Sequence, residues 1–169
     1  MRRSFDAWRY VHALAVLAIG LTAGTALAHV LEMPHKLAMT GAEWLPIQQT
    51  IYNGWGPKLF WLNVLAIVAL ASIIVRFPLA RVAAFSSLGM LLIADVVLFV
   101  IWIAPTNNAL DAWTLPAPMP DWQTLRANWE WGHAARAALL SAATFAACLA
   151  APHRTSTPKD RTRGTAQPA

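Results

Sequence analysis

The stretch VAAFSSLGMLLIADVVLFVIWIA, residues 82–104, is apolar apart from two serines and the carboxylic acid of Asp95. A helix needs about 20 apolar residues to cross the hydrocarbon core of a bilayer, so this stretch has the length of a membrane span. A second apolar stretch, residues 59–75, ends just before it, and Arg76 and Arg81 lie in the short turn between the two. The sequence therefore predicts two antiparallel transmembrane helices joined by a positively charged turn.

Two further apolar stretches, residues 13–30 and 134–151, complete a predicted set of four spans. Arg2, Arg3 and Arg9 precede the first span, and further basic residues follow the fourth. Because Lys and Arg near span ends are retained on the cytoplasmic side, both termini are predicted to be cytoplasmic. The predicted fold class is all-α, an integral membrane four-helix bundle with N-in and C-in orientation, located in the inner (cytoplasmic) membrane.

The predicted domain organisation is a four-span transmembrane domain, residues 1–152, followed by a disordered basic cytoplasmic tail, residues 153–169. Of the 169 residues, 57% are hydrophobic and 12% are charged, which is too apolar for an ordinary soluble domain. The formal charge is +5, but the basic residues lie at the ends of apolar runs. The lipid bilayer is therefore an expected partner, and nucleic acid is not.

The first apolar stretch has a second interpretation as a secretory signal peptide. Arg2 and Arg3 precede it, and Ala26-Leu27-Ala28 forms a small-residue cleavage site before His29. Cleavage would leave a His29 amino terminus, whose amine and imidazole can chelate copper. The apolar region is long for a signal peptide, so we prefer the uncleaved span.

Two longer connections, about 31–58 and 105–132, are predicted on the outer side. In the second connection, Asp121 is a candidate cap for a helix that begins near Trp122 and continues into the fourth span. Tryptophans are concentrated in these connections and at span ends. They are predicted to form an interfacial aromatic belt, and a ligand-facing role is the alternative. The residues concerned are Trp44, Trp55, Trp61, Trp102, Trp113, Trp122, Trp129 and Trp131.

Histidine and glutamate side chains recur at the outer end of the first span. On a helix, His29, Glu32 and His35 lie within an arc of about 120°, so they can face one cavity. Two imidazoles and a carboxylate suit Fe, Cu, Mn or Zn, and His133 is a further candidate ligand. The alternative is that the histidines are interfacial and form hydrogen bonds to a loop. Glu32 still requires a partner at the membrane boundary.

The start of the fourth span carries Trp129, His133 and Arg136 on one helix face. If Arg136 is buried, it needs a counter-charge, and Glu32 and Asp95 are the two candidates. The alternative is that Arg136 extends outward along the helix to water.

Asp95 lies near the middle of the third span, where an unpaired charge costs about 2.5–3.5 kcal/mol. We therefore expect it to face the bundle interior. Two roles remain open for it, a protonated acid that ties helices together and a proton relay. Asn63 in the second span is predicted to form an interhelical hydrogen bond.

Two short motifs resemble the anthrone oxygenase-like family of small four-span membrane proteins. They are Pro105-Thr106-Asn107-Asn108-Ala109-Leu110, and Trp129-x3-His133-x2-Arg136. The resemblance covers roughly residues 10–150 and includes the order of the four spans. It implies oxidation of a lipophilic aromatic compound, such as an anthrone to an anthraquinone. The residues it implicates are Asn107, Asn108, Trp129, His133 and Arg136.

The polar and aromatic residues of the outer half also indicate, independently, a small-molecule pocket near the outer leaflet. In a cofactor-free scheme, His133 or His29 removes a proton from an activated C–H group, and Arg136 and Asn107 stabilise the resulting enolate. A metal held by His29, Glu32, His35 and His133, or a haem between His29 and His133, is the alternative. The predicted catalytic residues are His133, Arg136, Asn107 and Glu32, and the predicted substrate-binding residues are Asn108, Trp129, Trp131 and Trp102.

Three function classes follow from these observations. The first is a membrane oxidoreductase acting on a small lipophilic substrate. The second is a noncatalytic membrane subunit, or a protein that binds a lipophilic ligand or a metal. A transporter is disfavoured, because no inverted repeat is visible and the spans hold one midplane acid, although an oligomer is left open. Cys148 is the single cysteine, so an internal disulfide is excluded.

Overall fold

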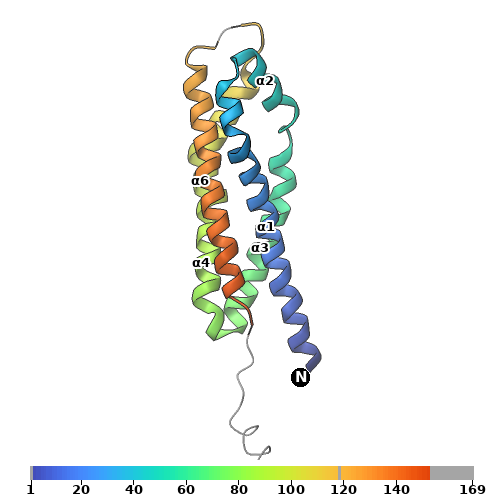
Figure 1. Ribbon diagram of the computed structural model, residues 1–169. Coiled ribbons are helices and arrows are strands. Elements are labelled where there is room, and N and C mark those ends of the chain that lie inside the picture. Colours follow the sequence, from blue (N-terminus) through green and yellow to red (C-terminus); the bar gives the residue numbers. More distant parts are fainter. Residues whose placement is uncertain (1, 118, 153–169) are drawn as a thin grey trace, which may run out of the picture.

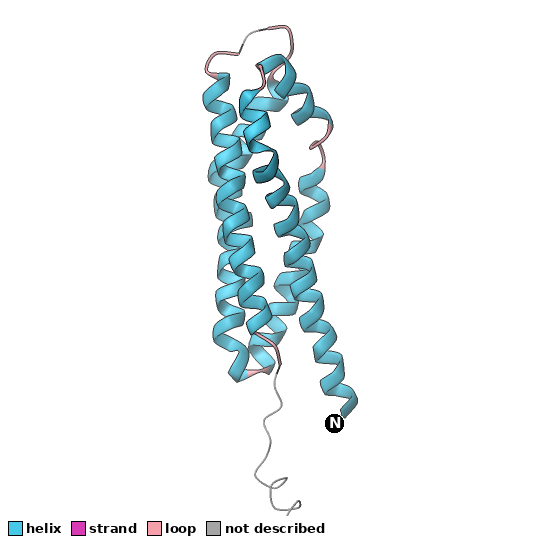
Figure 2. Cartoon of the chain, viewed as in Figure 1, coloured by secondary structure: helices cyan, strands magenta, loops and turns pink. Residues whose placement is uncertain are grey.

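The computed structural model describes residues 2–117 and 119–152, with the backbone alone for residues 2–6. The Arg2 and Arg3 side chains and the predicted tail, residues 153–169, lie outside this description. Every regular element in the described part is helical (Figure 2). The elements are α1 (Arg2–Ala38), α2 (Gly41–Thr50), α3 (Trp55–Arg76), the 3-10 turn η1 (Pro78–Ala80), α4 (Arg81–Leu92), the π-helical η2 (Ile93–Ile103), α5 (Ala104–Ala112) and α6 (Trp122–Leu149).

The long helices lie side by side as a bundle (Figure 1). The elements from η1 to α5 continue into one another and form a single long helix, Pro78–Ala112. Helix α1 packs against α3 and α6, and α4 packs against α3 and α6. The start of α1 and the turn after α3 lie at one end of the bundle, whereas α2 and the connection before α6 lie at the other end (Figure 1).

Three helical stretches in the described part are long and apolar enough to cross a membrane: Ala7–Ala38, Trp55–Arg76 and Pro78–Ala112. They contain the first three predicted spans. The predicted fourth span lies in α6, which does not meet this criterion. Its bundle-facing residues are largely alanines, such as Ala137, which are less hydrophobic than leucine but allow helices to approach closely.

Hydrogen bonds to the α6 backbone hold this helix in the bundle. Ser87 on α4 donates its hydroxyl to the carbonyl of Ala143 at 2.8 Å. His12 on α1 reaches the carbonyl of Ala147 at 2.9 Å through Nε2, which must be the donor because a carbonyl only accepts. Helix α6 therefore contacts both neighbours through small residues and polar links.

The predicted outer connections are wrong in their extent, because both are largely helical. Helix α1 continues to Ala38, where Arg126 donates to the carbonyl of Lys36 at 2.9 Å and also to that of Met39. These bonds satisfy carbonyls that a helix end leaves without partners. Pro105 does not end the third long helix; it lies where the π-helical η2 passes into α5.

The prediction that a helix begins near Trp122 is confirmed. Asp121 occupies the predicted cap position, but its side chain forms no capping hydrogen bond. Its backbone adopts a left-handed conformation, with φ of 57°, and its carbonyl accepts a bond from the Leu125 N–H at 3.1 Å. Asp121 therefore marks the start of the helix through its backbone and does not cap the N–H groups of the first turn.

The tryptophans do not form a simple belt. Trp44, Trp113 and Trp129 are buried and form a second core cluster with Leu45 and Leu110. Trp61 and Trp131 are exposed, as a belt would require. A Cβ atom added at Gly41 would lie 3.0 Å from Trp113 and 3.2 Å from Trp122, so this glycine allows α2 to approach the cluster.

Candidate functional site

A cavity of about 640 Å³ lies toward the α2 end of the bundle. This volume is within the usual range for small-molecule sites. Helices α1, α2, α3 and α6, the turn after α2 and the η2–α5 segment all contribute to its walls. Its polar and aromatic wall residues include His29, Gln48, Tyr52, Asn63, Asp95, Asn107, Trp129, His133 and Arg136.

Two histidines from different helices meet in the wall of the cavity. The rings of His29 on α1 and His133 on α6 have centroids 4.3 Å apart and are inclined by 42°. Trp129 lies against both rings, with centroid distances of 4.8 Å to His29 and 4.2 Å to His133. Both histidines are buried, and His133 Nδ1 has no hydrogen-bond partner in the described part of the chain. His133 therefore retains a free nitrogen.

Lys36 lies behind the histidine pair, with its side chain only 3% exposed. Its ammonium is 2.8 Å from the Glu32 carboxylate and 3.2 Å from His29 Nδ1. It also lies above two aromatic rings, 4.3 Å from the centre of Tyr52 and 5.0 Å from the centre of Trp129. A carboxylate and two aromatic faces thus compensate the buried positive charge.

Tyr52, in the turn before α3, closes this arrangement by donating its hydroxyl to Glu32. Burial, followed by the bond to the Glu32 carboxylate, raises the pKa of Tyr52 above its usual value. Tyr52 therefore remains a neutral hydrogen-bond donor at physiological pH. Since Tyr52 and Lys36 both contact Glu32, this carboxylate is engaged by two groups of the protein.

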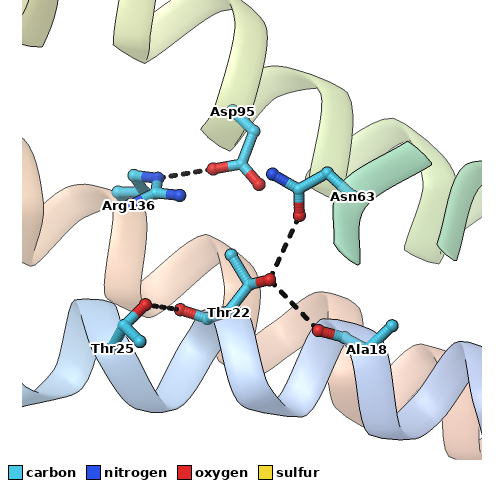
Figure 3. Close-up of polar contacts among 6 residues, drawn as sticks. All are labelled: Ala18, Thr22, Thr25, Asn63, Asp95 and Arg136. Carbon is cyan, nitrogen blue, oxygen red and sulfur yellow. Dashed lines mark hydrogen bonds and ion pairs between the residues drawn. The ribbon is translucent and has the colours of Figure 1, made fainter. Parts of the chain in front are cut away.

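The deeper part of the cavity contains an ion pair between two long helices. Arg136 Nε donates to Asp95 Oδ1 at 2.5 Å, and the two side chains are 9% and 8% exposed (Figure 3). Asp95, and not Glu32, is therefore the counter-charge of Arg136. The alternative that Arg136 extends outward to water is wrong.

Asn63 extends this polar cluster to a third helix. Thr22 on α1 donates its hydroxyl to Asn63 Oδ1 at 3.2 Å, so the predicted interhelical hydrogen bond is confirmed. Figure 3 shows the amide nitrogen of Asn63 turned toward Asp95. The four side chains bring together polar groups from α1, α3, η2 and α6 within the apolar bundle.

The two motifs behind the family resemblance meet in space. Trp129 Nε1 on α6 donates to Asn107 Oδ1 on α5 at 2.9 Å. Asn107 thereby holds the indole that packs against both histidines. Its own amide nitrogen remains a donor available at the cavity wall.

Several predicted site residues lie elsewhere. Asn108 and Trp131 are exposed, and Trp102 packs against α6 beside Gly132, so none of the three lines the cavity. His35 is exposed on α1. In the described residues, no group of three or more His, Cys, Asp or Glu side chains is arranged to hold a metal ion. The structure therefore does not assemble the predicted four-residue metal set.

Sequence reasoning missed Lys36, Gln48 and Tyr52. Lys36 had a usable signal, since it follows Glu32 by four residues and His29 by seven and so shares their helix face. The spacing was not used because the predicted first span stops at residue 30, whereas helix α1 continues to Ala38. Gln48 and Tyr52 offered no comparable pattern, because α2 and the turn after it bring them to the cavity.

A second set of buried polar groups lies beside the cavity. Both carboxylate oxygens of Glu130, both amide atoms of Gln48 and the indole Nε1 of Trp44 lack a well-formed hydrogen bond in the described part. Glu130 precedes the predicted fourth span, and burial raises its pKa to about 7. The charge of this acid therefore changes close to neutral pH.

No family model, curated protein or solved structure matches this chain. The resemblance to the anthrone oxygenase-like family consequently rests on the two motifs and the order of the predicted spans.

Proposed function

We propose that the chain is a multi-pass protein of the inner membrane, with α6 as a fourth span and both termini on the cytoplasmic side. Three helices long and apolar enough to cross a membrane support this topology, and α6 runs along two of them. Arg76 and Arg81 lie at the end of the bundle where α1 begins, as the retention of positive charge inside requires. The cavity then opens toward the outer leaflet.

We further propose that the cavity binds a small lipophilic aromatic molecule and catalyses its oxidation. The observation that carries this proposal is one cavity of about 640 Å³ that joins a histidine pair to the Arg136 guanidinium within aromatic walls. Tyr52, Trp55, Phe99 and Trp129 supply flat apolar surface for an aromatic ring system. The polar groups are few and converge on the same space, as expected for a reactive site.

The reaction we propose is oxidation of an acidic C–H group next to a carbonyl, as in an anthrone. His133 removes the proton, and the electron pair is delocalised onto the carbonyl oxygen as an enolate. Free N–H groups of Arg136 and the amide of Asn107 stabilise this negative charge. The electron-rich carbon then reduces dioxygen. One oxygen atom becomes the new carbonyl, and the other leaves as water with the two hydrogens of the original CH₂ group.

The arrangement of the histidines bears on the alternatives with a cofactor. Ring centroids 4.3 Å apart leave no space for a porphyrin between His29 and His133, so the pair does not suit a haem held from both sides. His29 Nδ1 already contacts Lys36, which leaves Nε2 as its remaining ligand atom. The geometry therefore favours acid–base chemistry by the imidazoles themselves.

The test is turnover of a hydroxyanthrone by protein purified in nanodiscs, followed by oxygen uptake and quinone absorbance. Bound metals and the visible spectrum are measured on the same preparation. We expect His133→Ala to lower kcat by about 10²–10⁴-fold, the usual contribution of a general base. His35→Ala, which changes an exposed histidine, is the matched control and should retain activity.

Two results would decide against the proposal. Equal activity of His133→Ala and wild type, with both folded, would remove His133 from the reaction. Absence of turnover combined with hydroxyanthrone binding, measured by quenching of the wall tryptophans, would support the noncatalytic binding protein instead.

A further inference from the structure

Lys36 has an unusual environment for a lysine, since its ammonium is buried and contacts an imidazole. Its three N–H groups are donors, and the ammonium has no lone pair with which to accept. The ammonium forms an ion pair with the Glu32 carboxylate at 2.8 Å, and Tyr52 donates to the same carboxylate. Arg126 donates to the backbone carbonyl of Lys36 at 2.9 Å and thereby fixes the end of the helix that carries it.

The direction of the Lys36–His29 contact follows from this chemistry. Because the ammonium can only donate, His29 Nδ1 at 3.2 Å must be the acceptor. A neutral imidazole carries one proton, so the proton of His29 lies on Nε2. We infer that Lys36 is a positioning residue that fixes His29 as the Nε2–H tautomer.

The fixed tautomer gives the two adjacent imidazoles different roles. His29 has no free lone pair, because Nδ1 accepts from Lys36 and Nε2 carries the proton. It can only donate a hydrogen bond to a molecule in the cavity. His133 Nδ1 is buried without a partner in the described part of the chain, so no hydrogen bond at Nδ1 fixes the tautomer of His133. This imidazole is therefore the member of the pair that keeps a lone pair for a proton.

This assignment rests on the proposed function for its chemical meaning, and it narrows the substrate class. The ligand must present an oxygen acceptor to the His29 Nε2–H group and an acidic C–H group to His133. A lipophilic aromatic ketone with a neighbouring CH₂ group meets both requirements. The donor from His29 then adds to the groups that stabilise the enolate.

The tautomer can be measured directly by long-range ¹H–¹⁵N correlation spectra of protein labelled with [¹⁵N]histidine in nanodiscs. His29 is assigned by its loss in His29→Gln. We expect the Nε2–H pattern in wild type and in Lys58→Met, which removes an exposed lysine outside the site. In Lys36→Met we expect a substantial Nδ1–H population, because the donor to Nδ1 is gone.

An Nδ1–H pattern for His29 in wild type would overturn the inference. An unchanged Nε2–H pattern in folded Lys36→Met would overturn it as well. If Lys36→Met does not fold, Lys36→Arg, which keeps a cationic donor, should retain the Nε2–H pattern, and a change to Nδ1–H there counts against the assignment.

Kinetics separate this inference from the proposed reaction. We expect Lys36→Met to lower kcat about 10- to 100-fold with little change in KM, as for other residues that orient a reacting group. A wild-type Nε2–H tautomer without any hydroxyanthrone turnover would reject the proposed reaction and leave the role of Lys36 standing. Turnover that depends on His133, together with an Nδ1–H tautomer of His29, would support the proposed reaction and reject the role of Lys36.

Discussion

Replacing Asp95 by leucine should strongly destabilise the bundle. The carboxylate is 8% exposed and accepts the Arg136 Nε–H bond at 2.5 Å, so the substitution leaves a guanidinium without its counter-charge among apolar helices. Removing one partner of a buried ion pair typically costs about 3–5 kcal/mol. An unpaired charge at the centre of a membrane helix costs about 2.5–3.5 kcal/mol on the insertion scale, which agrees. The folding equilibrium constant should fall by about two to more than three orders of magnitude.

The assay is equilibrium unfolding in mixed micelles with a rising fraction of dodecyl sulfate, followed by circular dichroism. Asp111→Leu is the matched control, because it removes an exposed carboxylate from the same long helix. The double variant Asp95→Leu/Arg136→Leu should recover most of the lost stability. Replacing both charges of a buried pair by packed apolar residues is often neutral or stabilising.

Two outcomes would refute this reasoning. Stability of Asp95→Leu within about 1 kcal/mol of wild type would mean that Arg136 does not depend on this carboxylate. Additive losses in the double variant would mean that the two residues act independently, since residues in one ion pair normally show coupling energies of about 0.5–3 kcal/mol.

Three further predictions concern packing, a helix end and pH. Gly41→Ala should lower the free energy of unfolding by about 1–3 kcal/mol, because the new Cβ would lie 3.0 Å from Trp113. Gly56→Ala is the control and should be tolerated, because its Cβ would have nothing within 4 Å. The two variants are compared by thermal unfolding. Arg126→Met should accelerate amide hydrogen exchange at the end of α1, because it removes two bonds to the last carbonyls there, and unchanged exchange would contradict this. Burial raises the pKa of Glu130 to about 7 from 4.5, so the folded state binds this proton more tightly than the unfolded chain. The stability of the fold should therefore fall as the pH rises between these two pKa values. Glu130→Gln should remove that decline from the unfolding temperature measured across the same pH range.

Much of the helical architecture was predictable from the sequence. Apolar stretches of span length predicted the three membrane-compatible helices, and a candidate cap predicted the start of α6 near Trp122. Local spacing also placed His133 and Trp129 on one face, where they contact each other. The cost of a midspan charge predicted that Asp95 faces the bundle interior. Each of these inferences depends either on the geometry of one helix or on the energetic cost of placing one charged residue in lipid. Both quantities can be derived from a single segment of the chain.

The site itself depended on how the helices pack. The sequence left Glu32 and Asp95 as equal candidates for Arg136, and the tertiary structure decided for Asp95 while pairing Glu32 with Lys36. It also brought His29 against His133 and left His35 exposed, although both His29 and His35 were candidates on one helix. The physical reason is that the advance of about 100° per residue determines neighbours within a helix. Which residues of different helices contact one another depends on the axial position and rotation of each helix. Both are determined by packing over the whole bundle.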